Sequence, residues 1–216
     1  MSRSRVLVAT VAGACVALVI LLYHGHPMPA AGAKLLASTG FIAIALRCGA
    51  LDSLFGRLVL AGLALSWCGD MLLVGTSEFF FLAGLVAFLL AHVFYVAAFV
   101  AHGYQRSWVL VGAVPITAIA IVVWTWLEPH APASLSIPVR AYIAVISLMV
   151  IFAFGTRGAG GSWLIACGAT LFFLSDLSVA ALRIVQTDMA TYVAGLPLYY
   201  SGQVCLALSV SQSRSH

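Results

Sequence analysis

The stretch SWLIACGATLFFLSDLSVAALRI, residues 162–184, is long enough to cross a membrane and carries only two charged residues, Asp176 and Arg183. A transmembrane helix needs about 20 predominantly apolar residues. A carboxylate at membrane depth costs at least ~2.5 kcal/mol even on the mildest insertion scale, so it normally faces a polar cavity or a partner. The stretch therefore predicts a membrane-spanning helix that contains a functional acid.

Residues 56–77 form a second apolar stretch with an acid inside it, Asp70. We expect both Asp70 and Asp176 to sit far from any other charge. Ionisable residues in this setting are functional by default. The two aspartates are therefore the first candidates for chemistry.

The composition identifies an integral membrane protein. Hydrophobic residues make up 63% of the 216 positions and charged residues only 7%, whereas about a quarter of the residues in a soluble domain are charged. The mean hydropathy is +1.13. The ten basic residues form no Lys- or Arg-rich run, so membrane lipids and not nucleic acid are the expected partners. The bias toward arginine and the lack of eukaryotic targeting signals favour a bacterial inner membrane.

Eight stretches meet the same criterion, and we expect them to form one all-α membrane domain. Residues that break helices lie between several of them, as in His26-Pro27-Met28-Pro29, Glu128-Pro129-His130-Ala131-Pro132 and Gly158-Ala159-Gly160-Gly161. The expected helices span residues 6–23, 33–50, 56–77, 79–101, 107–127, 137–154, 162–184 and 191–210.

Basic residues near the ends of these helices predict the orientation. With a cytoplasmic N-terminus, the inside set is Arg3, Arg5, Arg47, Arg57, Arg106, Arg157 and Arg214, and the outside set is Lys34, Arg140 and Arg183. This excess favours cytoplasmic placement of both termini. A cleaved signal peptide is the competing interpretation, because Ala31-Gly32-Ala33 resembles a cleavage site. The first apolar run is longer than a usual signal-peptide core, so we expect the first helix to be retained.

The chain also contains an internal similarity. Residues 62–70, GLALSWCGD, align with residues 168–176, GATLFFLSD, and share the glycine, one leucine and the aspartate. Chance is the simplest alternative, because Ala, Gly and Leu are abundant in membrane helices. A parallel repeat of four plus four helices would place both aspartates in the same half of the membrane, where they could share a cavity.

Polar side chains on the helices near the aspartates are candidates for substrate binding. Ser66 lies one turn before Asp70, and Ser175 directly precedes Asp176. Each candidate can also be explained as a packing residue or an interface aromatic. The candidate binding residues are Ser66, His92, Tyr95, Tyr142, Ser175, Tyr199 and Gln203.

The cysteines and histidines do not indicate a metal or another cofactor. A zinc site needs three or four ligands, and we place only one histidine, His92, within the hydrophobic span. The cysteines lie in apolar segments without a CxxC pair, as expected for small core residues. They are Cys15, Cys48, Cys68, Cys167 and Cys205.

An ordered set of motifs extends over the last six expected helices. It comprises Gly69-Asp70 with Leu72-Leu73, Gly84 and Phe88 leading into Ala91-His92-Val93-Phe94-Tyr95, Ser175-Asp176, and Tyr199-Tyr200 leading into Gln203. In order and spacing this set resembles the YhhN family of membrane lysoplasmalogenases. The resemblance implies hydrolysis of the vinyl ether bond of lysoplasmalogens, a class of lysophospholipid, to a fatty aldehyde and glycerophospho-ethanolamine or glycerophosphocholine. It also implies that Asp70 and Asp176 are the catalytic pair.

Two carboxyl groups in a partly dry site suit this reaction. Hydrolysis of a vinyl ether begins with protonation of the outer alkene carbon, and water then captures the resulting oxocarbenium ion. One carboxyl must therefore be protonated at neutral pH, a form that burial and a neighbouring carboxylate both favour. The ionised partner can stabilise the cation and orient water, as glycosidase carboxylates do. The sequence leaves open which aspartate is the acid.

Two other functions fit intramembrane acids. A proton-coupled transporter of small molecules or lipids is the leading alternative, although Pro115 and Pro197 do not occupy equivalent positions in the two halves. An aspartyl intramembrane protease is suggested by Cys68-Gly69-Asp70 and Leu196-Pro197-Leu198. The acids of that protease class lie on consecutive helices, unlike Asp70 and Asp176.

Overall fold

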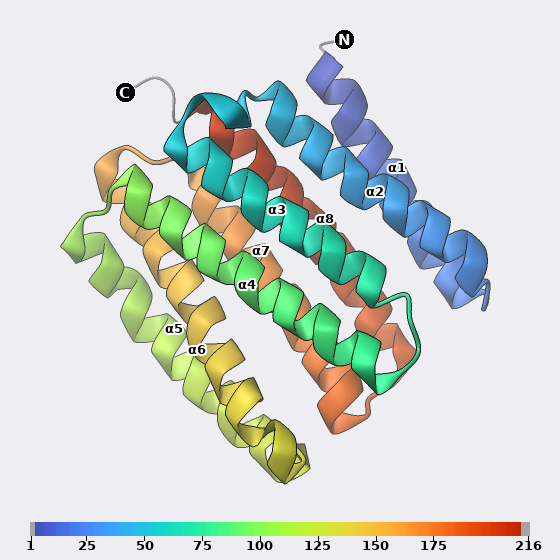
Figure 1. Cartoon of the computed structure of the whole chain (residues 1–216). Helices are drawn as coiled ribbons and strands as arrows, with labels where there is room; N and C mark the ends of the chain where they lie inside the picture. Colours follow the sequence, from blue (N-terminus) through green and yellow to red (C-terminus); the bar gives the residue numbers. More distant parts are fainter. Residues whose placement is uncertain (1–2, 213–216) are drawn as a thin grey trace.

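The computed structural model describes residues 3–212, and within them eight helices are long and apolar enough to cross a membrane (Figure 1). The prediction of an all-α protein with eight transmembrane helices is confirmed. The helices are α1 (Arg3–Tyr23), α2 (Pro27–Arg47), α3 (Leu54–Leu72), α4 (Glu78–His102), α5 (Arg106–Leu127), α6 (Ala133–Gly155), α7 (Trp163–Ala180) and α8 (Met189–Gln212). Three short turns, η1 (Ala50–Asp52), η2 (Glu128–His130) and η3 (Thr156–Ala159), are 3₁₀-helical, and η4 (Ala181–Val185) is a π-helical turn that prolongs α7.

Serine residues cap the starts of three helices. The side chains of Ser53, Ser77 and Ser162 each accept a hydrogen bond from a backbone N–H in the first turn of α3, α4 and α7. An oxygen at this position satisfies a donor that has no partner within the helix. The caps fix where α3 and α7 begin, and therefore how far along each helix its aspartate lies.

Helix α2 begins at Pro27, earlier than the expected start at residue 33. A proline in the first turn loses nothing, because its missing N–H would have no partner within the helix. The segment His26-Pro27-Met28-Pro29 is therefore a helix start and not a linker. As a result Lys34 lies about two turns inside α2.

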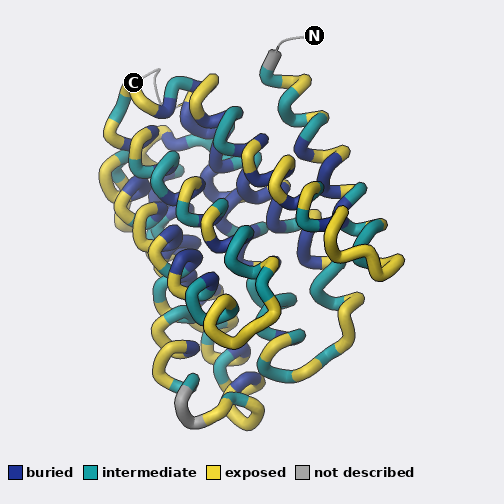
Figure 2. Tube along the Cα trace, turned by 45° about the vertical axis from the view of Figure 1, so that its right-hand side comes forward, coloured by how far each residue is buried: buried dark blue, intermediate teal, exposed yellow. Residues whose placement is uncertain are grey.

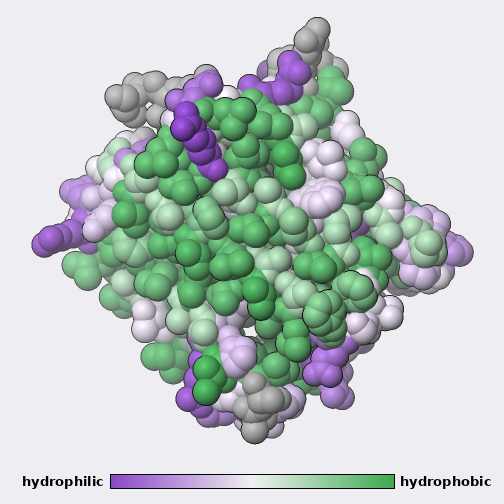
Figure 3. All heavy atoms as spheres, viewed as in Figure 1, coloured by the Kyte–Doolittle hydropathy of each residue, from purple (hydrophilic) through white to green (hydrophobic). Residues whose placement is uncertain are grey.

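Two central hairpins are flanked by two outer hairpins. Helix α3 packs against α4, and α7 against α8, while α1 and α2 lie along α8 and α6 packs on α4 and α7 (Figure 1). Buried residues gather in the middle of this arrangement (Figure 2). Hydrophobic residues cover the middle of the face seen in Figure 3, and hydrophilic residues lie at its edges. This distribution fits a bundle whose sides contact lipid.

The two halves of the chain share a pattern of neighbours. Helix α2 packs on α3 and α8, and four helices later α6 packs on α7 and α4. The internal repeat itself stays a prediction. The C-terminal ends of α3 and α7 lie at the same end of the bundle, opposite the end where α1 begins and α8 finishes (Figure 1).

Candidate active site

A cavity lies between the helices near the C-terminal ends of α3 and α7. Its wall is formed by residues from α2 through α8 and includes both Asp70 and Asp176. The volume of about 110 Å³ leaves room for several water molecules. Much of the remaining wall is apolar, with Leu85, Phe88 and Ile146 as examples. The site therefore combines two carboxyl groups with an apolar space.

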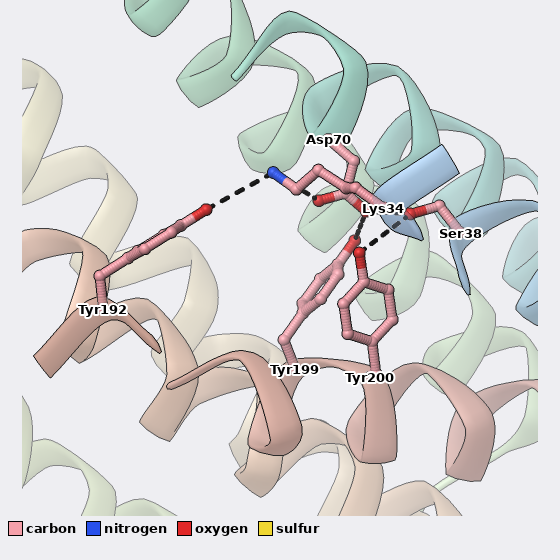
Figure 4. A network of polar contacts seen from close by, with 6 residues as sticks. All are labelled: Lys34, Ser38, Asp70, Tyr192, Tyr199 and Tyr200. Carbon is pink, nitrogen blue, oxygen red and sulfur yellow. Dashed lines mark hydrogen bonds and ion pairs between the residues drawn. The ribbon is translucent and has the colours of Figure 1, made fainter. Parts of the chain in front are cut away.

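Asp70 is almost completely buried and surrounded by donors (Figure 4). Ser38 Oγ donates a hydrogen bond to its Oδ2 at 2.6 Å, and the Tyr199 hydroxyl donates to the same oxygen at 2.7 Å. On the other side, Lys34 Nζ lies 3.4 Å from Oδ1. Two short hydrogen bonds and a facing ammonium group stabilise the ionised form of a carboxyl group.

Lys34 corrects two expectations from the sequence. It was expected to be a charge outside the membrane, and Asp70 was expected to be far from other charges, but the two form a buried ion pair. The error arose because a helix start at residue 33 left Lys34 at the helix end. A lysine two turns inside an apolar helix needs a buried partner. That requirement could have marked Lys34 as a candidate from the sequence, although it does not say which acid is the partner.

Tyrosines of α8 complete the environment of Asp70 (Figure 4). The Tyr192 hydroxyl accepts a hydrogen bond from Lys34 Nζ at 3.5 Å, and the Tyr200 hydroxyl lies 3.3 Å from Ser38 Oγ. Tyr192 and Tyr199 are two turns apart on one face of α8, which lets one helix contact both members of the ion pair. Of the three tyrosines, only Tyr199 was a candidate from the sequence.

Asp176 has different partners. The Tyr142 hydroxyl donates a hydrogen bond to its Oδ2 at 2.6 Å, and His92 Nε2 lies 3.6 Å from the same oxygen. The Asp176 side chain is 15% exposed, compared with 4% for that of Asp70. Among the described residues, no lysine or arginine pairs with it. Asp176 therefore lacks the fixed positive charge that Asp70 has.

The structure separates the candidate binding residues into groups. Three line the cavity: Tyr142, Ser175 and Tyr199. His92 contacts Asp176 but is completely buried behind the wall, with its ring 4.7 Å from that of Phe172. Ser66, Tyr95 and Gln203 are also completely buried and are not part of the wall, and Tyr95 donates to Gln203 Oε1 at 2.8 Å. A role in substrate binding stays a prediction for all of them.

The sequence model of the YhhN family matches residues 29–210, which is most of the chain. This chain belongs to the YhhN family. Human lysoplasmalogenase TMEM86A is 30% identical to this YhhN chain over 162 residues, covering 72% of the chain and 66% of the relative. Pig lysoplasmalogenase TMEM86B is 32% identical over 145 residues, covering 67% of the chain and 59% of the relative. The chain therefore spans somewhat less than two thirds of the length of these relatives. No solved structure matches it.

Two glycines of the ordered motif set, Gly69 and Gly84, bring α3 and α4 together beside Asp70. A Cβ atom added at Gly69 would lie 2.7 Å from the ring of Phe88, and one at Gly84 would lie 2.9 Å from the side chain of Leu73. Small residues allow this close approach between membrane helices. The motif therefore places Phe88, which lines the cavity, directly against the helix that carries Asp70.

Proposed function

We propose that this YhhN protein hydrolyses the vinyl ether bond of lysoplasmalogens, with a fatty aldehyde and glycerophospho-ethanolamine or glycerophosphocholine as products. The observation that carries the proposal is a pair of aspartates with unlike partners on the wall of one apolar cavity. The names of the human and pig relatives support the same activity. A transporter has no comparable support.

The first step needs an acid, and Asp176 is suited to supply it. Transfer of its proton to the outer alkene carbon forms a C–H bond and leaves an oxocarbenium ion at the carbon attached to the ether oxygen. A carboxyl group can do this only if it holds a proton at neutral pH. Asp176 faces an apolar cavity, and no lysine or arginine of the described chain pairs with it. An apolar setting without a facing cation favours the neutral acid, and this effect outweighs the single hydrogen bond that the Tyr142 hydroxyl donates.

Asp70 is suited to remain a carboxylate. Lys34 balances its charge, and Ser38 and Tyr199 donate hydrogen bonds to it. Asp70 stabilises the developing cation at short range through its carboxylate oxygens on the cavity wall, while the Lys34–Asp70 pair as a whole stays neutral. Water then adds to the cationic carbon and gives up a proton to the carboxyl pair, and the hemiacetal splits into aldehyde and alcohol. The two carboxyl groups of glycosidases have similar separate roles, one as the acid and the other as the charge-stabilising carboxylate.

Substrate selectivity tests the proposed reaction. Purified protein in lipid nanodiscs should release aldehyde from a lysoplasmalogen and none from the saturated alkyl-ether analogue, because the analogue has no alkene to protonate. Comparable cleavage of both lipids would contradict vinyl ether chemistry. Substrate-dependent ion flux in liposomes without aldehyde formation would favour a transporter.

A further inference from the structure

The cavity has a second cation that the proposed chemistry does not use. Among the described residues that line it, the lysines and arginines are Lys34 and Arg183. Lys34 is buried and paired with Asp70. Arg183 is exposed, and its guanidinium carbon lies 4.9 Å from the centre of the Phe81 ring. No carboxylate in the described chain forms an ion pair with Arg183.

Arg183 lies at the end of the same helical run as Asp176. It belongs to the π-helical turn η4 and follows Asp176 by seven residues, which is roughly 10 Å along a helix. Asp176 lies deeper in the bundle, and Arg183 lies at the helix end where the side chain is exposed. One wall of the cavity therefore carries an acid inside and a cation at its mouth.

We propose that Arg183 binds the phosphate of a lysophospholipid at the mouth of the cavity. The inference rests on the proposed function, because it assigns a binding site to the phosphate of the substrate proposed there. Guanidinium groups bind phosphate oxygens through paired, charge-assisted hydrogen bonds. The three-carbon glycerol unit separates the phosphate from the ether oxygen, so a phosphate held at Arg183 directs the vinyl ether inward, toward Asp176.

The charges of the cavity agree with this assignment. Lys34 and Asp70 balance each other, and a protonated Asp176 is neutral, so Arg183 leaves one positive charge for one phosphodiester. The acidic residues on the described part of the wall are Asp70 and Asp176, both deep in the cavity. The headgroup amine lies beyond Arg183 and meets no acidic side chain of the wall, so ethanolamine and choline substrates should be cleaved with similar efficiency.

Arg183→Gln tests the assignment with two vinyl ether substrates. For a lysoplasmalogen, the KM should rise about tenfold or more, the scale of a lost hydrogen-bonded charge pair. For 1-alkenylglycerol, which has no phosphate, the KM should be unchanged. Arg183→Lys keeps the charge and should fall between the wild type and Arg183→Gln.

Arg140→Gln is the matched control. Arg140 is also exposed near the α5–α6 connection, but it pairs with Glu128, stacks on Trp124 and is not part of the cavity wall. This variant should leave both KM values unchanged. If Arg183→Gln raised the two KM values equally, or neither of them, the phosphate assignment would be wrong.

A binding measurement keeps the test independent of turnover. The non-cleavable 1-O-hexadecyl lysophosphatidylcholine should bind wild-type protein more tightly than Arg183→Gln, whereas 1-O-hexadecylglycerol should bind both equally. If Arg183→Gln bound both ligands more weakly by the same factor, or bound both as tightly as the wild type, the assignment would be overturned. If the wild type binds the phospholipid through Arg183 but releases no aldehyde from either vinyl ether, the proposed reaction fails and the phosphate site stands.

Discussion

Asparagine has nearly the size and shape of aspartate. Replacing Asp70 or Asp176 by asparagine therefore removes the carboxyl group with little change of side-chain shape. Asp176→Asn removes the proposed proton donor and Asp70→Asn removes the proposed charge-stabilising carboxylate, so each should lower aldehyde release by ~10² or more. If the two groups act as one unit, as proposed, the double variant should be little worse than the poorer single variant. Activity is measured on protein shown to be monodisperse and membrane-inserted.

Asp188→Asn is the control for this series. Asp188 is exposed, accepts hydrogen bonds from Thr191 and lies outside the cavity wall. It should keep wild-type activity. Near-normal hydrolysis by either Asp70→Asn or Asp176→Asn would refute the catalytic assignment of that residue.

Lys34 and Asp70 should depend on each other for stability. Lys34→Met leaves a buried carboxylate without its cation, which typically costs ~3–5 kcal/mol of unfolding free energy. Adding Asp70→Asn removes the stranded charge and should restore much of the stability but none of the activity. Unfolding of the wild type, both single variants and the double variant in mixed micelles measures this coupling. A Lys34→Met protein as stable as the wild type would show that the pair contributes nothing.

At the scale of helices, the close contact of α3 and α4 should be sensitive to one methyl group. Gly69→Ala places a Cβ atom 2.7 Å from the Phe88 ring, and overpacking of this kind costs about 1–3 kcal/mol. Gly32→Ala in α2 is the matched control, because its Cβ would meet nothing within 4 Å. That change should be neutral or stabilise the helix by up to about 1 kcal/mol. Thermal unfolding of the two variants compares them directly, and equal stability would argue against tight packing at Gly69.

The individual helices were predictable because each depends on the local pattern of the chain. Hydropathy and serine caps are sufficient to indicate α3, α4 and α7. The start of α2 was misplaced, because a proline breaks a helix in its interior but is tolerated in the first turn. Because the helix was expected to start at residue 33, Lys34 was placed at its end and was not among the candidate site residues.

At the scale of the molecule, orientation decides on which side of the membrane the cavity lies. Because Lys34 is buried, it no longer counts as an outside charge, which strengthens the bias toward cytoplasmic termini. Arg214 lies outside the described residues. Reporter fusions after Arg106 and Arg157 should be cytoplasmic, and fusions near Glu78 and Glu128 external. The opposite result would put the cavity mouth on the cytoplasmic side.

The sequence by itself determined the membrane class, the all-helical fold, the family and the two intramembrane acids, because these follow from hydropathy, charge and motif order along the chain. Only the tertiary structure decided which partners each acid has. Lys34 comes from α2, and Tyr199 lies 129 positions from Asp70 in the sequence. Hydropathy does not specify which faces of distant membrane helices meet, since that depends on the shape and packing of side chains. The unlike surroundings of Asp70 and Asp176 therefore became visible only in the folded protein.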